Sequence, residues 1–391
     1  MELSRSWTVT YPREAFAFNS LGLAYAAFGQ HDEAVQAFRE AIRLDPKFVS
    51  PHRNLTGSLI ALNRFVEAAS VARTATADGI DSIGVRQYAY LAAFLANDSS
   101  AMERERERSR TRGAQDAMWS TNTEAQTSRF SGRVQTAHEL YQRAVQAALR
   151  ENSRELAAQW TLEDAESHAM VGQCGDAGRE AAAGLELGRD NFTLERASRA
   201  LALCAAGGAS ELSAELASRF PSATLTRRIQ LPVTAAALAV GRGESARAIE
   251  LLDPVKPFDH APVSEFWPTY LRGQAYLHAK DGRSAAIQFQ NILDHRGVAP
   301  TSPLYPLAHL GLARAAAMVG DVGRARQAYD SFFALWNGAD PTLQPLQQAR
   351  AEYGRLRSYT ASRVVRIASE SQKRARRHPV AGRLSACKKS R

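Results

Sequence analysis

The sequence predicts an all-α solenoid of about nine helix-turn-helix units. Alanine is very frequent among the 391 residues, with Leu, Arg, Glu and Gln in support, and all are good helix formers. A pattern of small and large apolar residues recurs about every 34 residues. No run of ~18 apolar residues appears, so the sequence predicts no segment that spans a membrane.

The clearest unit runs from Ala15 to Pro46 and reads AFAFNSLGLAYAAFGQHDEAVQAFREAIRLDP. Small and apolar residues fall at helical spacing on both sides of a turn at Gly29. They are Phe18, Leu21, Gly22, Tyr25, Ala34, Phe38 and Ala41. Gly22 and Ala34 are small enough for the two helices of the unit to approach closely. Phe18, Tyr25 and Phe38 should fill the gap between this pair and the next.

Later units are found from a turn residue that is followed five places later by a small or apolar residue. The turn residues are Gly29, Asn63, Asn97, Gly132, Gly172, Gly207, Gly241, Lys280 and Gly320. They predict one array over residues 15–260, with units near 15–48, 49–82, 83–116, 118–151, 158–191, 193–226 and 227–260. Two further units follow over residues 266–340, after a proline-rich stretch that we interpret as a joint between two stacks.

The two ends of the chain differ from the repeats. Residues 1–14 are predicted to be the remnant of a preceding repeat, because Pro12 lies 34 residues before Pro46. Residues 341–357 are predicted to form a capping helix, and residues 358–391 a basic disordered tail. From residue 357 onward there are eleven Lys and Arg against the single acid Glu370, so the rest of the chain is nearly neutral.

Motifs that carry catalysis are missing from the sequence. There is no GxxxxGK phosphate loop, GxGxxG, GxSxG or HExxH, and none of the kinase signatures. The nine histidines are scattered, and no two of them sit with cysteines or carboxylates at ligand spacing. We therefore expect no enzyme activity, no catalytic residue, no metal and no cofactor.

The three cysteines, Cys174, Cys204 and Cys387, are far apart in the sequence and form no CxxC pair. Such a sparse, odd count predicts a reducing compartment without a disulfide framework. The amino terminus has no apolar stretch of the kind that a secretory signal needs. Together these features predict a cytoplasmic protein.

The unit from Ala15 to Pro46 resembles the tetratricopeptide repeat (TPR) family. That family's pattern has a large residue, Leu-Gly, Tyr, a turn Gly, Ala, an aromatic residue, Ala and a closing Pro. The matching residues here are Phe18, Leu21, Gly22, Tyr25, Gly29, Ala34, Phe38, Ala41 and Pro46. The resemblance implies a right-handed superhelix, in which the first helix of each unit lines a concave groove that binds peptides or helices.

The family's groove positions fall on eight candidate residues of this chain. They are Phe16, Asn19 and Leu23 in the first unit, Arg53 and Ile60 in the second, and Gln87, Leu91 and Phe94 in the third. Their apolar character is typical of a groove that captures a helix or an extended peptide. The alternative is that several of these side chains are core between helices.

Two segments also resemble the repeat region that follows the kinase domain of some bacterial eukaryotic-like serine/threonine kinases. They are TYPREAFAFNSLGLAYAAFGQHDEAVQAFREAIRLDP and QPLQQARAEYGRL. The resemblance implies a sensor or docking arm in bacterial signalling, with a kinase or its substrates as protein partners. The alternative is a nucleic-acid-associated regulator, because the tail over residues 373–391 could contact phosphates or an acidic surface.

Overall fold

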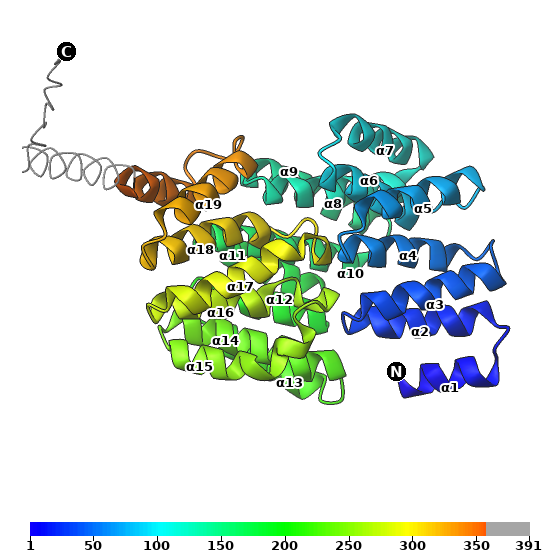
Figure 1. Cartoon of the computed structure of the whole chain (residues 1–391), viewed down its shortest axis with the longest axis horizontal. Helices are drawn as coiled ribbons and strands as arrows, with labels where there is room; N and C mark the ends of the chain where they lie inside the picture. The colour runs from blue at the N-terminus through cyan, green and yellow to red at the C-terminus, as the bar shows by residue number, and fades with distance from the viewer. Residues whose placement is uncertain (357–391) are drawn as a thin grey trace, which may run out of the picture.

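The computed structural model describes residues 1–356, and within that range the chain contains helices and no strand (Figure 1). This confirms the predicted all-α solenoid. A single helix, α1 (Glu2–Thr10), precedes nine successive helix pairs, and residues 344–356 form a final helix. The predicted tail over residues 358–391, with its candidate nucleic-acid contact, lies outside the described residues.

The nine pairs follow one another along the chain, and consecutive helices pack against each other. They are α2 (Ala15–Ala27) with α3 (His31–Leu44), α4 (Val49–Ala61) with α5 (Phe65–Ala77), α6 (Ile83–Leu95) with α7 (Ser99–Arg112), α8 (Ala114–Phe130) with α9 (Val134–Arg150), α10 (Arg154–Met170) with α11 (Cys174–Leu187), α12 (Asn191–Leu203) with α13 (Ala209–Arg219), α14 (Leu231–Gly241) with α15 (Ser245–Leu252), α16 (Trp267–His278) with α17 (Gly282–Asp294), and α18 (Leu304–Met318) with α19 (Val322–Leu335).

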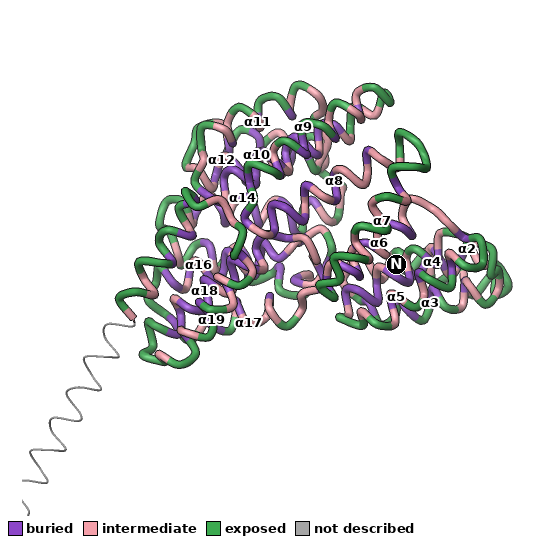
Figure 2. Tube along the Cα trace, turned by 90° about the horizontal axis from the view of Figure 1, so that it is seen from above, coloured by how far each residue is buried: buried purple, intermediate pink, exposed green. Residues whose placement is uncertain are grey.

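Four short helices lie in the connections between the later pairs. They are η1 (Thr226–Gln230), η2 (Asp253–Phe258), η3 (Pro262–Ser264) and η4 (Arg296–Val298). In Figure 2 the buried positions gather on helices such as α8, α10 and α14, where neighbouring pairs face one another. None of the helices in the described part of the chain is both long and apolar enough to span a membrane.

Left-handed backbone conformations mark the turns between paired helices. Seven of the nine turn residues chosen from the sequence have a positive φ there. They are Gly29 (78°), Asn63 (59°), Asn97 (55°), Gly132 (71°), Gly172 (83°), Lys280 (62°) and Gly320 (79°). Glycine and asparagine tolerate this region best, which explains why they recur at the period. In the sixth and seventh pairs the position shifts, to Ala205 (50°) and Gly243 (75°).

Close packing between helices depends on aromatic rings that lie against glycines. Phe38 of α3 is fully buried, and a Cβ added to Gly22 of α2 would come within 2.4 Å of its ring. In the eighth and ninth pairs the ring of Phe289 lies against two glycines, Gly273 and Gly311, whose added Cβ atoms would approach it to 2.7 Å and 2.5 Å. These contacts leave no room for a larger residue.

Replacing Gly311 by alanine is therefore expected to destabilise the fold by about 1–3 kcal/mol, because the buried Phe289 ring cannot move aside. Gly178→Ala is the matched control, since a Cβ at this helical glycine of α11 would meet nothing within 4 Å. It should stabilise by up to about 1 kcal/mol through helix propensity alone. Urea unfolding of both variants tests the difference, and equal effects would contradict the packing account.

The array also curls back, so that early pairs touch late ones (Figures 1 and 2). The amide of Asn63, in the turn of the second pair, donates to the carbonyl of Asp294 at 2.7 Å and accepts from the backbone N–H of Gly297 at 2.8 Å. The indole Nε1 of Trp336 donates to the carbonyl of Phe130 at 3.1 Å. We call these contacts the closure contacts, because each joins residues more than 200 positions apart.

The proline-rich stretch between the seventh and eighth pairs takes part in the closure. It forms η2 and η3, and η3 contacts α2. The ring of Phe258 in η2 lies 6.0 Å from that of Phe28, and the carbonyl of His260 lies 3.4 Å from the ring nitrogen Nε2 of His31. The stretch therefore packs against the first pair of the array.

A disulfide corrects the expectation drawn from the cysteines. The sulfur atoms of Cys174 and Cys204 are bonded, and their Cα atoms lie 5.5 Å apart. Cys174 begins α11 and Cys204 follows α12, so the bond joins the turns of two neighbouring pairs. The prediction that these two cysteines are unpaired was wrong. The cysteine count therefore no longer supports a reducing compartment.

Candidate functional site

The first helices of neighbouring pairs are joined by hydrogen bonds between polar side chains. Such bonds link α2 to α4, α6 to α8 and α8 to α10. They run from Asn54 to Asn19 at 3.0 Å, from Gln87 to Thr123 at 3.2 Å and from Gln126 to Glu163 at 2.9 Å. The surface along these helices, which we call the inner surface, therefore carries an ordered row of polar groups.

The candidate groove residues divide by exposure. Phe16 is 55% exposed and Leu23 is 44% exposed, both on α2, and Arg53 of α4 is exposed as well. Asn19 is only 3% exposed and bonded to Asn54, and Ile60 is 1% exposed within a core cluster. Buried side chains cannot contact a partner, so Ile60 is a core residue, and Asn19 serves to hold α2 against α4.

The three candidates on α6 are half-buried and have partners inside the chain. Gln87 bonds to Thr123, and Leu91 packs against a core cluster. The ring of Phe94 meets that of Phe130 edge to face at 5.1 Å, and the guanidinium of Arg296 lies 5.8 Å from its centre. Gln87 and Phe94 therefore join the third pair to the fourth, and Phe94 also contacts η4. None of the three side chains is fully exposed to solvent.

An aromatic cluster surrounds Phe16 at the amino-terminal end of the array. The ring of Trp7 on α1 lies 5.4 Å from that of Phe16, and Phe48 stacks on its other side at 6.2 Å. Trp7 is 38% exposed, and α1 has no buried residue. Large apolar groups thus remain in water here, although aromatic side chains gain most from burial.

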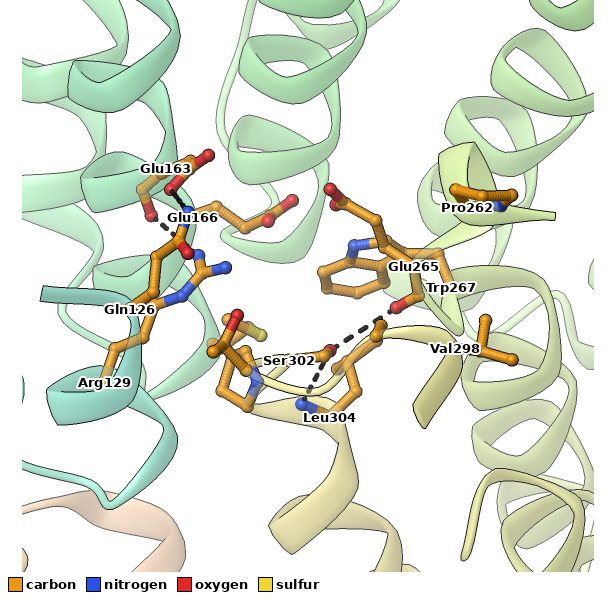
Figure 3. A pocket seen from close by; sticks show the side chains of 14 residues that line it. Gln126, Arg129, Glu163, Glu166, Pro262, Glu265, Trp267, Val298, Ser302 and Leu304 are labelled. Carbon is orange, nitrogen blue, oxygen red and sulfur yellow. Dashed lines mark hydrogen bonds between the residues drawn. The ribbon is translucent and has the colours of Figure 1, made fainter. Parts of the chain in front are cut away.

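A polar cavity of about 150 Å³ lies farther along the inner surface (Figure 3). It is bordered by α8, α10, the start of α16 and the segment that follows η4. The polar residues that line it are Gln126, Arg129, Glu163, Glu166, Glu265, Thr301 and Ser302, and Trp267 adds an aromatic wall. Figure 3 shows Glu265 and Trp267 on one side, facing Glu163, Glu166 and Arg129 on the other.

Behind the carboxylates of this cavity lies a buried network of arginines. The Arg199 side chain is 2% exposed and donates to Glu166 Oε1 at 2.6 Å, and it also pairs with Glu195. Its guanidinium lies 4.7 Å from the centre of the Trp267 ring. Arg196 donates to Glu265 Oε1 at 2.8 Å. Every carboxylate of the network thus has a cation beside it, which buried charges require.

Pairing sets the ionisation of this network. Burial alone would raise the pKa of Glu265, but the positive charges of Arg196 and Arg199 outweigh it and hold that pKa below its ordinary value. Burial would lower the pKa of Arg196, and the charges of Glu265 and Glu166 reverse this and raise it. Glu265 and Arg196 therefore both keep their charges near neutral pH.

Arg129 differs from the other arginines of the cavity. It is 7% exposed, its Nη1 makes one long bond of 3.4 Å to the carbonyl of Glu163, and its Nε has no partner. Among the described residues, no carboxylate oxygen lies within ion-pair distance of it. A buried guanidinium with unused donors can bind a carboxylate or carbonyl oxygen that enters the cavity.

The structure also corrects the prediction that no two histidines sit with a carboxylate at ligand spacing. Asp164 and His168 are four residues apart on α10, and His138 of α9 lies against both. The i, i+4 spacing on one helix face was visible in the sequence and could have revealed two members of the group. The third could not have been found, because it depends on how α9 packs.

Comparison with known proteins identifies the repeat in two places. Residues 15–48 and residues 306–331 match the tetratricopeptide repeat family. The first segment holds α2 and α3, and the second holds most of α18 and the start of α19. No curated protein matches the chain in sequence.

Several solved structures resemble the chain at low identity. Yeast Tom70 shares 11% identity over 94% of both chains, with a TM-score of 0.43. The TPR domain of P58(IPK) shares 12% over 91% of this chain and 92% of that one, with a TM-score of 0.29. A chain of the Naa15/Naa10 complex bound to HypK-THB shares 14% over 89% and 62%, with a TM-score of 0.26. With such low TM-scores, these similarities do not indicate what this chain binds.

Proposed function

We propose that the chain is a non-catalytic scaffold that binds a peptide or helical segment of a protein partner on its inner surface. The observation that carries the proposal is the exposure of Phe16 and Leu23 on α2. Residues seven apart lie on the same face of a helix, so the two side chains form one apolar strip. Exposed apolar groups at this spacing are the usual anchors for a segment that docks along a groove.

The repeat matches support this function, since tetratricopeptide units stack into extended concave surfaces that suit protein binding. The cavity beside Arg129 adds a polar anchor on the same row of first helices, because its unused donors suit an acidic side chain or a chain end. An apolar strip at one end and a charged cavity farther along would together fix the direction of a bound segment.

The partner class that we favour is a signalling protein of the kinase type. The segments around Phe16 and around Gln344 resemble the repeat arm of bacterial eukaryotic-like serine/threonine kinases, which supports a role as a docking or sensing arm. Kinase motifs are missing from this sequence, so the resemblance extends to docking alone.

Peptide selection tests the proposal without a known partner. A random peptide library is displayed and selected against the full chain, and enriched peptides are synthesised and titrated by fluorescence anisotropy. Leu23→Glu and Phe16→Glu are each expected to weaken binding about tenfold or more, because a charge replaces an apolar anchor. Ile287→Glu is the matched control, since Ile287 of α17 is also an exposed apolar residue, at 66%.

Two outcomes would overturn the proposal. One is that selection enriches no peptide that binds the full chain in solution. The other is that enriched peptides bind the Phe16 and Leu23 variants as tightly as the parent and lose affinity only when Ile287 is changed.

A further inference from the structure

Three ligand atoms of the types that metals prefer converge between α9 and α10. They belong to His138, Asp164 and His168, and all lie within 4.8 Å of one another. The Nδ1 of His138 is 3.5 Å from the Nε2 of His168, which in turn is 3.6 Å from the Oδ1 of Asp164. The remaining pair, His138 Nδ1 and Asp164 Oδ2, is hydrogen-bonded at 2.5 Å.

These separations suit a tetrahedral metal ion. Zinc binds imidazole nitrogen and carboxylate oxygen at about 2.0–2.2 Å, which puts two ligands of a tetrahedron roughly 3.3 Å apart. Two of the three separations are within a few tenths of that value. The third shortens because His138 and Asp164 share a proton, and a metal ion would take the place of that proton.

Neighbouring amides orient both imidazoles with a nitrogen toward the centre of the cluster. The Nδ1–H of His168 donates to Gln173 Oε1 at 2.7 Å, which leaves the lone pair of Nε2 facing His138 and Asp164. The Nε2 of His138 lies 2.9 Å from the Gln142 amide. A half-turn of that amide presents its oxygen to Nε2–H and leaves Nδ1 free to bind.

Asp164 adds an independent sign of a ligand. It is 1% exposed, and its Oδ1 has no hydrogen-bond partner among the described residues, although it lies 3.6 Å from the Nε2 of His168. A buried carboxylate oxygen without a partner is costly, and a cation at this point would remove that cost. His138 is 22% exposed in its side chain, so an ion can enter from its side.

We propose that His138, Asp164 and His168 bind one divalent transition-metal ion, with zinc as the best fit. Two imidazoles and one carboxylate are typical of zinc, whereas magnesium and calcium take oxygen ligands almost alone. Water completes the coordination. The ion ties the second helix of the fourth pair to the first helix of the fifth and so braces the middle of the array.

Glu180 is part of the electrostatic surroundings of the cluster. Burial raises its pKa, and the negative charge of Asp164 raises it further. The cluster lies between α9 and α10, and none of its three residues lines the cavity, so it neither requires nor excludes the peptide binding that we propose for the inner surface.

Zinc titration of the full chain tests the site. The protein is stripped with chelator, carries no histidine tag, and is titrated with zinc chloride by calorimetry, with metal analysis after dialysis. We expect one ion per chain and a melting temperature that rises by at least about 2 °C. His138→Gln and Asp164→Asn should each weaken zinc binding about 100-fold or more, because a first ligand is lost.

His278→Gln is the matched control, since this histidine is exposed at the end of α16, far along the chain from the cluster. Cobalt provides a second readout that does not depend on the stability of any variant. A tetrahedral site of nitrogen and oxygen ligands gives the visible bands of tetrahedral cobalt without a thiolate charge-transfer band. Zinc binding that survives His138→Gln and Asp164→Asn, or a cobalt spectrum with thiolate bands, would refute the site, as would no binding at all.

Discussion

Replacing Arg199 by methionine is expected to lower the free energy of unfolding by about 3–5 kcal/mol. The Arg199 side chain is 2% exposed and is the cation between two buried carboxylates, Glu166 and Glu195. Methionine preserves much of the volume but leaves both carboxylates without their main partner. A buried charge that loses its partner costs far more than an intact pair contributes.

Chemical denaturation of the parent and of Arg199→Met measures this loss directly. Arg247→Met is the matched control, because Arg247 pairs with Glu250 at 2.7 Å on an exposed face of α15. Because water screens an exposed ion pair, the pair contributes little to the free energy of unfolding. This variant should therefore stay within about 0.5 kcal/mol of the parent. If both variants lose the same stability, the buried ion pairs around the cavity contribute no more to the free energy of unfolding than an exposed pair does.

Adding Glu166→Leu and Glu195→Leu to Arg199→Met should recover most of the lost stability. The triple variant has no unpaired carboxylate left, and apolar side chains replace the buried charges. This recovery separates a charge effect from a packing effect, since lost packing around Trp267 would remain uncorrected in the triple variant.

Sequence reasoning succeeds where the fold is local. The pattern of the first unit predicted that Gly22 would let its two helices approach closely, and the ring of Phe38 on the second helix does lie against Gly22. Helical spacing within one pair and the stacking of adjacent pairs both follow from a period of about 34 residues. The positive φ of turn residues such as Asn63 follows from the same pattern.

The cavity could not be predicted in this way. Arg129, Glu166 and Glu265 lie far apart in the sequence and meet only because the stack curls and the segment after η2 packs inside it. The curvature comes from small angles between pairs that accumulate along the array, and no residue pattern encodes their sum. The side chain of Ile60, a candidate groove residue, lies in a core cluster formed by the first three pairs, and η4 also packs on α4 beside it.

The spacing of the two bonded cysteines is itself a signal of their proximity. Cys174 and Cys204 are 30 residues apart, close to one period of the repeat. In a solenoid, residues about one period apart occupy equivalent places in neighbouring units and are therefore near each other. In a repeat protein, two residues that are about one repeat apart in the sequence can therefore be close in space, and their separation should be compared with the repeat length.

Replacing Trp336 by alanine is expected to cost about 3–5 kcal/mol and to loosen a turn two hundred residues away. Trp336 is 2% exposed, its indole N–H donates to the carbonyl of Phe130, and its ring lies where a Cβ on Gly132 would come within 2.8 Å. In an open solenoid each pair contacts only its neighbours, so damage in the ninth pair would not reach the fourth. The closure contacts change that expectation.

Hydrogen exchange at residues 128–134 measures the coupling, and it should rise in Trp336→Ala. Phe289→Ala is the matched control, because Phe289 is equally buried but its ring packs against Gly273 and Tyr270 of α16 and Gly311 of α18, all in the eighth and ninth pairs. It should lose similar stability and leave exchange at residues 128–134 unchanged. If Trp336→Ala raises exchange only within its own pair, the stability of the fourth pair does not depend on its contact with the ninth, and this prediction is wrong.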